Sequence, residues 1–384
     1  MIYQSFKSRV QAIRAPAAIF LIATLAGCSL FGGGPVKPQP AELQPITPLV
    51  AVRQSWNTRV GQVNFPLEMG VSGNSVAVAS GDGTVALLDA QTGRDIWRLA
   101  LGTTLAAGVG NDGKVVAVVT RANEVVALQE GKELWRQKMG AQAFSAPFVA
   151  GLRVFVLAAD RSVTAFDGQT GRKLWTQQRP NEPLVLRQSG VMLAVGDTLV
   201  VGLAGRLVGL NPSNGSVRWE APIATPRGIN DVERLVDLVG RVSRQGDVVC
   251  ARAFQASVGC VNAVRGSLLW TKPANGVQGI DGDDRLLFGT EADGTVNAWR
   301  RTDGERTWST DRLRYRSLTA PVVVGRSIAV GDFSGYVHLL SREDGSVLNR
   351  LATDGSAIAA TPVLAGNTLI AVTRNGGVYG FQPQ

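Results

Sequence analysis

The sequence predicts an all-β protein: an eight-bladed β-propeller whose blades are four-stranded antiparallel sheets. Three observations carry this prediction. A glycine–tryptophan pair recurs along the chain, its spacing is close to forty residues, and the units at the two ends of the chain are incomplete. The composition agrees, because a charged fraction of 18% and 45 glycines suit a turn-rich globular body.

The repeated pair is a glycine followed four residues later by a tryptophan. A residue that stands at the same place in every repeat normally packs neighbouring repeats together. We therefore expect the indole rings to cover the gaps between blades; the alternative is a ladder that stacks a ligand. The copies are Gly93/Trp97, Gly131/Trp135, Gly171/Trp175, Gly215/Trp219, Gly266/Trp270, Gly304/Trp308 and a degenerate Gly345/Asn349.

Each repeat divides into four short strands separated by turn residues. In the third copy, the expected strands are 145–149, 154–157, 163–166 and 173–177. Pairs such as Asp82-Gly83 fall between the second and third strands of their units, where a tight hairpin needs residues that tolerate positive φ.

The last unit has no fourth strand of its own. After Gly376 the chain reads one more strand, through Phe381, and then ends. The segment 50–60 contains Trp56 without a preceding glycine, as an isolated fourth strand would. We expect these two segments to pair and close a ring over residues 50–384, which removes the open sheet edges.

The first residues have the character of an export signal. A basic start is followed by an apolar run, 15–26, that is too short for a permanent membrane span, and then by Leu25-Ala26-Gly27-Cys28. This resembles a bacterial lipoprotein signal, which implies removal of residues 1–27 and acylation of Cys28, with palmitate among the acyl chains. The alternative is an ordinary secretory signal with an incidental cysteine. Ser29, in place of aspartate, implies sorting to the outer membrane.

Residues 28–49 are expected to form a flexible tether, since they contain three consecutive glycines and several prolines. The formal charge of +9 falls by three when Lys7, Arg9 and Arg14 are removed. The remaining excess suits contact with anionic headgroups or acidic partners. No run of lysine and arginine is dense enough to indicate nucleic-acid binding.

Cys250 and Cys260 are expected on paired strands of the fifth repeat, facing each other across a hairpin. Two interpretations stay open. An oxidising periplasm permits a cross-strand disulfide. Against this, Cys260 occupies the small-residue position that alanine fills in other copies, and directly paired strand positions rarely suit a disulfide.

The sequence contains no convincing catalytic or metal site. The single histidine, His338, lies in a strand position and is interpreted as a packing residue. No His/Cys cluster has the spacing of metal ligands. We therefore expect no catalytic residues, no metal and no cofactor.

The repeat resembles that of the pyrroloquinoline quinone dehydrogenases, which read Ala-x-Asp-x-x-x-Gly-x-x-x-Trp. Ala165, Asp167, Gly171 and Trp175 match this pattern. Those enzymes are longer and add a vicinal cysteine pair, which this chain lacks. A second family with this repeat, the BamB lipoproteins of the outer-membrane β-barrel assembly machinery, combines a lipobox with a bare eight-bladed propeller and resembles the whole mature chain.

The BamB resemblance extends to two insertions, 179–190 and 223–245. It implies that Leu184, Leu186 and Arg187 in the first insertion contact the periplasmic domains of BamA. In the second it implies the same for Arg234, Leu235 and Asp237, although Val239 replaces an acidic residue of the family motif, so a change at Asp237 should matter less. Two other interpretations stay open: that Leu184 and Leu186 belong to the first strand of the fourth blade, and that Arg234 pairs with Asp237 within its loop.

By this resemblance the protein is a non-enzymatic scaffold, lipid-anchored at the periplasmic face of the outer membrane. Its implied partners are BamA, other subunits of the machinery and unfolded outer-membrane proteins. The alternatives are a quinone-dependent periplasmic dehydrogenase and a solute-binding propeller.

Overall fold

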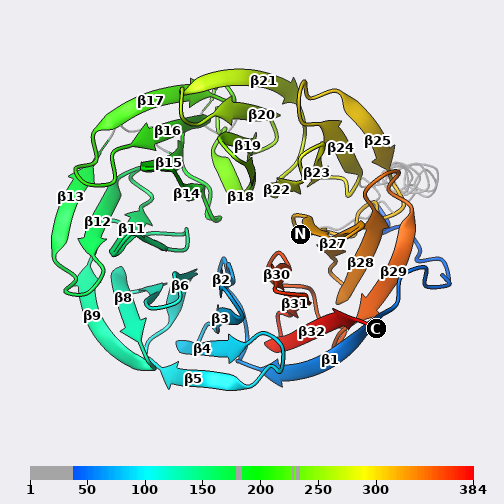
Figure 1. Cartoon of the computed structure of the whole chain (residues 1–384), viewed down its shortest axis with the longest axis horizontal. Helices are drawn as coiled ribbons and strands as arrows, with labels where there is room; N and C mark the ends of the chain where they lie inside the picture. The colour runs from blue at the N-terminus through cyan, green and yellow to red at the C-terminus, as the bar shows by residue number, and fades with distance from the viewer. Residues whose placement is uncertain (1–37, 179–183, 227–228, 231–233) are drawn as a thin grey trace, which may run out of the picture. The chain divides into compact units, whose positions relative to one another are not determined.

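The structure is a computed structural model that describes residues 38–178, 184–226, 229–230 and 234–384. Eight four-stranded antiparallel sheets follow one another around a ring, as the sequence predicts (Figure 1). No helix is present among the described residues, so none there is long and apolar enough to cross a membrane.

Blades 1 to 4 each use four consecutive strands. They comprise β2 (Gly70–Ser72), β3 (Ser75–Ala79), β4 (Thr84–Asp89) and β5 (Asp95–Ala100); β6 (Leu105–Asn111), β7 (Val116–Thr120), β8 (Glu124–Gln129) and β9 (Lys132–Lys138); β10 (Phe148–Ala150), β11 (Arg153–Leu157), β12 (Val163–Asp167) and β13 (Lys173–Gln177); and β14 (Met192–Val195), β15 (Thr198–Leu203), β16 (Arg206–Leu210) and β17 (Val217–Pro222).

Blades 5 to 7 follow the same order, and blade 8 combines the two ends of the chain. They comprise β18 (Leu238–Gln245), β19 (Val248–Ala253), β20 (Ser257–Asn262) and β21 (Ser267–Pro273); β22 (Ile280–Gly282), β23 (Leu286–Thr290), β24 (Val296–Arg300) and β25 (Arg306–Thr310); β26 (Val322–Val324), β27 (Ser327–Gly331), β28 (Tyr336–Ser341) and β29 (Val347–Ala352); and β30 (Val363–Ala365), β31 (Thr368–Val372), β32 (Gly377–Pro383) and β1 (Val52–Arg59).

Each blade runs from an innermost first strand to an outermost fourth strand (Figure 1). Because neighbouring strands are antiparallel, the connections between blades lie on the same face as the turns between second and third strands. We call this the loop face. The second and third strands are almost wholly buried, as in β3 and β4, whereas the outer strands expose alternate residues.

The ring closes by pairing of β1 with β32 (Figure 1), which confirms the prediction from the sequence. Val52 faces Pro383 at one end of the ladder and Arg59 faces Gly377 at the other. Trp56 lies opposite Gly380 and is 9% exposed. Blade 8 therefore depends on residues more than 300 positions apart.

The tryptophans pack one blade against the next, as predicted. The Trp135 indole N–H donates to the Gly168 carbonyl in the following blade at 2.9 Å. A methyl group added at Gly171 would lie 2.6 Å from the Trp135 ring. The glycine of each pair therefore leaves room for the tryptophan of the preceding repeat. Gly171 also has a positive φ of 69°, which glycine adopts without strain. The same indole-to-carbonyl hydrogen bond is made by Trp56, Trp175, Trp270 and Trp308.

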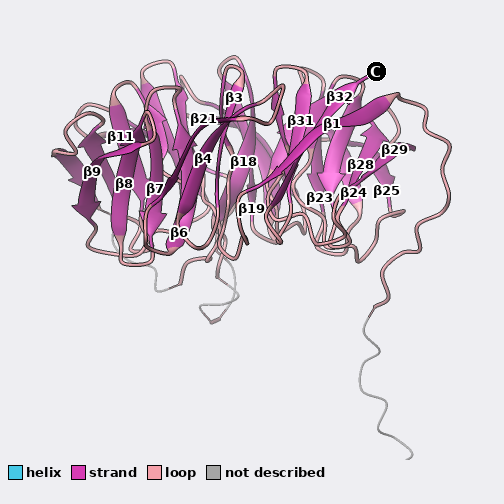
Figure 2. Cartoon of the chain, turned by 90° about the horizontal axis from the view of Figure 1, so that it is seen from below, coloured by secondary structure: helices cyan, strands magenta, loops and turns pink. Residues whose placement is uncertain are grey.

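The segment that precedes β1 lies against the ring. Ala41 hydrogen-bonds to the backbone of Arg314 and accepts a 3.0 Å hydrogen bond from Arg316, and Leu49 donates to the Leu348 carbonyl at 2.8 Å. Figure 2 shows this segment along the outer edge of the propeller. The predicted tether therefore includes a stretch that is bound to blade 7, and its residues before Pro38, with Cys28, lie outside the described part of the chain.

One predicted boundary is wrong. The sequence predicts a second insertion over 223–245, but the insertion ends before β18, the innermost strand of blade 5. The alternation of this strand is interrupted by a bulge between Val239 and Ser243, and it carries Arg241 and Arg244. Because of the bulge and the arginines, this strand lacks the regular alternation of apolar and polar residues by which a strand is recognised in a sequence.

Candidate functional site

The first insertion reaches the loop face between β13 and β14. Leu184 is 40% exposed, Arg187 is exposed, and Leu186 is half-buried. None of them lies in a strand, because β14 begins only at Met192. The interpretation of Leu184 and Leu186 as the first strand of blade 4 is therefore wrong.

The second insertion meets the first through Asp237. The Asp237 carboxylate accepts the backbone N–H of Leu186 at 3.0 Å and forms an ion pair with Arg161 at 2.6 Å. Arg161 also donates to the Leu184 carbonyl at 2.9 Å. The side chains of Arg161 and Asp237 are only 7% and 15% exposed. A mostly buried ion pair from blade 3 and the second insertion thus fixes the backbone of the first insertion.

Arg234 and Leu235 stand beside this connection. Arg234 is exposed and Leu235 is half-buried. The interpretation of Arg234 and Asp237 as an ion pair within the loop is wrong, since Asp237 binds Arg161. Val239 is 1% exposed in β18, so an apolar side chain suits the position where the family motif is acidic.

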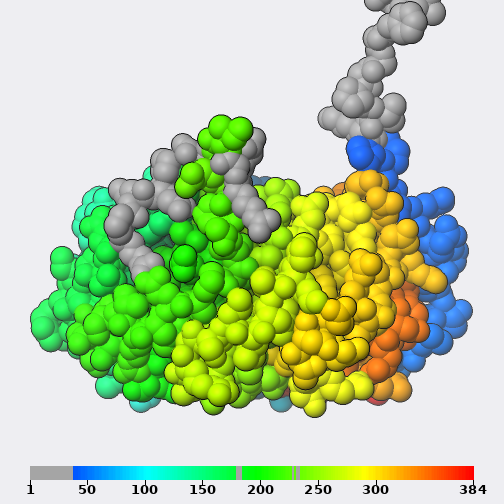
Figure 3. Space-filling view, turned by 90° about the horizontal axis from the view of Figure 1, so that it is seen from above, coloured from blue at the N-terminus to red at the C-terminus, as the bar shows by residue number. Residues whose placement is uncertain are grey.

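Together, six residues form what we call the composite surface, on the loop face where blades 3, 4 and 5 adjoin. The upper rim in Figure 3 shows the green described residues of this region projecting from the body of the ring. Its members are Leu184, Leu186, Arg187, Arg234, Leu235 and Asp237.

Two later residues of the first insertion, Gln188 and Ser189, are held by further hydrogen bonds. Gly240 N–H donates to the Ser189 carbonyl at 2.7 Å, and the Gln188 amide donates to the Val277 carbonyl at 2.7 Å. The Arg187 guanidinium lies 5.7 Å from the centre of the Phe144 ring. These contacts order residues 184–190, so binding through them needs little further ordering.

Sequence reasoning missed Arg161. This residue occupies the turn between the second and third strands of blade 3, where glycine stands in other blades, for example Gly83 and Gly294. Its φ is 61°, in the left-handed region that favours glycine. An arginine at a position where other blades have glycine could have indicated, from the sequence, that this turn contacts the neighbouring loops.

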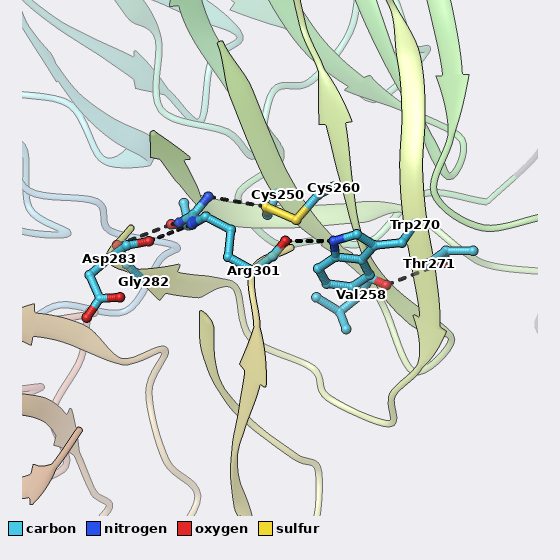
Figure 4. The surroundings of a disulfide bond; sticks show 9 residues. Cys250, Val258, Cys260, Trp270, Thr271, Gly282, Asp283 and Arg301 are labelled. Atoms are coloured by element: carbon cyan, nitrogen blue, oxygen red, sulfur yellow. Dashed lines mark hydrogen bonds between the residues drawn. A yellow bond between two sulfur atoms is a disulfide. The ribbon is translucent and has the colours of Figure 1, made fainter. Parts of the chain in front are cut away.

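Cys250 and Cys260 form a disulfide, which decides between the two interpretations left open by the sequence. They are directly paired on β19 and β20, with their Cα atoms 4.0 Å apart, and both are fully buried. Figure 4 shows the Arg301 guanidinium beside Cys250, 3.4 Å from its sulfur. The bond lies within blade 5 and is closed to solvent.

His338 is fully buried in β28, as a packing residue would be. Its Nε2 lies 2.9 Å from the Asp332 carboxylate, which also binds Arg316 at 2.8 Å. Burial lowers the pKa of His338. No group of three or more His, Cys, Asp or Glu side chains that could hold a metal ion occurs within the part of the chain that the structure describes.

Known proteins match this chain over almost its whole length. A family model described as outer membrane protein assembly factor BamB matches residues 81–310. Proteins of that name from Burkholderia pseudomallei and Bordetella pertussis are 39% and 36% identical, covering 90% and 92% of this chain and 92% and 93% of their own lengths. The crystal structure of BamB from Moraxella catarrhalis superposes with a TM-score of 0.78 at 23% identity, covering 86% of this chain and 99% of that one. This chain belongs to the BamB family of outer membrane protein assembly factors.

Proposed function

We propose that this protein is a non-enzymatic scaffold of the outer-membrane β-barrel assembly machinery. It is anchored by acylated Cys28 at the periplasmic face of the outer membrane, and it binds the periplasmic domains of BamA through the composite surface. In this way it supports the folding and insertion of β-barrel proteins. The relatives named as outer membrane protein assembly factors support this role.

The observation that carries the proposal is the connection of two insertions into one ordered surface. Neither insertion is needed to complete a four-stranded blade. The Arg161–Asp237 ion pair nevertheless holds their backbones together. Leucine side chains flanked by exposed arginines are the composition of an interface with an apolar centre and a charged rim.

The cysteines favour a scaffold over a quinone-dependent dehydrogenase. The dehydrogenases that this repeat resembles carry two adjacent cysteines. Cys250 and Cys260 are ten residues apart and are bonded to each other across a hairpin inside blade 5. Both cysteines therefore cross-link two strands of blade 5.

We expect Leu186→Ala combined with Arg187→Ala to abolish most of the binding to the periplasmic domains of BamA. Interface anchors of this kind contribute about 2 kcal/mol or more each, which corresponds to roughly thirtyfold in affinity for one residue. The melting temperature should change little, because Arg187 is exposed and the Leu186 N–H remains available to Asp237. A binding titration beside thermal melts measures both quantities.

The matched control is Val264→Ala with Arg265→Ala, an exposed apolar–arginine pair in a turn on the opposite face. This variant should bind like the wild type. Wild-type affinity in the Leu186/Arg187 variant would remove the first insertion from the interface. Loss of affinity accompanied by unfolding would show that Leu186 acts in packing.

We expect Cys28→Ala to release the folded propeller from the outer membrane. Several acyl chains are needed for lasting attachment, at about 0.8 kcal/mol per buried methylene group, and no other anchor is proposed. Membrane fractionation of cells that lack BamA measures the effect, with Ser29→Ala as the control that keeps the cysteine. If the Cys28 variant sediments with membranes as fully as the control, acylation of Cys28 is not the anchor.

A further inference from the structure

A hollow of about 880 Å³ opens at the centre of the loop face. Its walls come from the connections between blades, such as 63–69 and 317–319, and from turns between second and third strands. The lining combines apolar side chains, including Phe65 and Leu318, with polar ones. This is the size and mixed character of sites that bind molecules larger than a single ion.

Among the described residues, four arginines from separate parts of the ring line this hollow. Arg121 comes from blade 2, Arg187 from the connection into blade 4, Arg241 from blade 5 and Arg374 from blade 8. Arg121, Arg187 and Arg374 are exposed, and among the described residues none of these three forms an ion pair with a carboxylate. Their charges are therefore available to a ligand.

The position of Arg241 is unusual for a strand residue. It lies in the bulge of β18, the innermost strand of blade 5, with a φ of 51°. Bulges of this kind redirect a side chain and are common beside functional sites. Its pair with Asp281 is long, at 3.3 Å, and its Nε has no hydrogen-bond partner in the described part of the chain.

The described lining of the hollow contains fewer acidic residues than arginines. Two acids of the described chain line the hollow, Glu68 and Glu291. Glu291 pairs at 3.1 Å with Arg252, whose side chain is fully buried. Burial raises the pKa of Glu68, although the nearby Arg241 opposes this. The hollow therefore has an excess of positive charge.

We propose that this hollow binds a carboxylate-rich segment of polypeptide. Guanidinium groups bind carboxylates through paired hydrogen bonds, and several of them around one opening attract an acidic chain from solution. The volume favours a peptide over a small anion. This site overlaps the proposed contact with BamA at Arg187 alone, so its other arginines can be changed without altering the composite surface.

The test measures binding of a fluorescein-labelled oligoglutamate peptide by anisotropy, with an oligoglutamine peptide of equal length as the neutral comparison. The full propeller should bind only the acidic peptide, and salt should weaken the complex. Arg121→Gln with Arg374→Gln should reduce the affinity severalfold, and adding Arg241→Gln should bring the loss to about tenfold. Thermal melts and the titration against BamA should remain unchanged in the double variant.

The control variant, Arg265→Gln with Arg326→Gln, removes two exposed arginines from turns on the opposite face. It should bind the acidic peptide like the wild type. An equal loss in this control would mean that only the overall charge attracts the peptide, and would overturn the site. Absence of peptide binding, or displacement of the peptide by inorganic phosphate at matched charge concentration, would also overturn it.

Discussion

Deletion of residues 50–60 should cost more than about 5 kcal/mol of folding free energy and open the ring. The deletion removes β1, whose ladder with β32 runs from Val52–Pro383 to Arg59–Gly377. It also removes Trp56, whose indole N–H donates to the Ala90 carbonyl in blade 1 at 3.1 Å. Loss of a buried tryptophan alone commonly costs about 3–5 kcal/mol.

The deletion also leaves β32 as an unpaired edge. Exposed edge strands pair with other chains, so we expect aggregation in addition to a lower melting temperature. Trp56→Ala separates the two effects, because it keeps the β1 backbone and removes only the packing between blades 8 and 1. It should destabilise the protein by about 3–5 kcal/mol without exposing the edge.

Thermal unfolding and light scattering measure these outcomes. The control is deletion of residues 30–39, which precede the segment bound to blade 7. This control should melt like the full chain. An unchanged melting temperature after deletion of 50–60 would contradict closure through β1.

The fold could be predicted because the glycine–tryptophan pair, which packs neighbouring blades together, recurs at the same position of successive repeats. Trp135 and Gly171 belong to different copies of the pair, yet they contact each other. The recurring pair therefore indicates two features of the fold: a turn within each blade, at the glycine, and the contact between neighbouring blades, at the tryptophan. The bulged β18 could not be predicted, since its interrupted alternation and its arginines resemble a loop.

The candidate site could be predicted only in part. The insertions are visible in the sequence because they lengthen two repeats. Their connection through Arg161 is not visible, since this residue lies 76 positions before Asp237. The disulfide could not be predicted from the sequence either, because a free buried cysteine and a disulfide-bonded cysteine both fit the same small-residue position.

We expect Asp237→Ala to destabilise the protein by about 3 kcal/mol and to weaken binding of BamA strongly. From the sequence alone Asp237 ranks below Leu186 and Arg187, but the structure places it at the junction of both insertions. Its removal leaves the mostly buried Arg161 without this carboxylate and the Leu186 N–H without its acceptor. The first insertion then loses the contact that positions its leucines, so the effect on binding is indirect.

A double-mutant cycle with Arg161→Ala isolates the ion pair, measured by chemical unfolding and by titration against BamA. The double variant should lose less than the sum of the single losses, by about 1–3 kcal/mol, because each single substitution already breaks the Arg161–Asp237 ion pair. The control is Glu343→Ala, which breaks an ion pair with Arg285. The side chains of Arg285 and Glu343 are 60% and 65% exposed, so this change should alter the free energy of unfolding by about 0.5 kcal/mol or less. Additive losses, or an Asp237 variant that keeps both stability and affinity, would show that the insertions hold their positions without this pair.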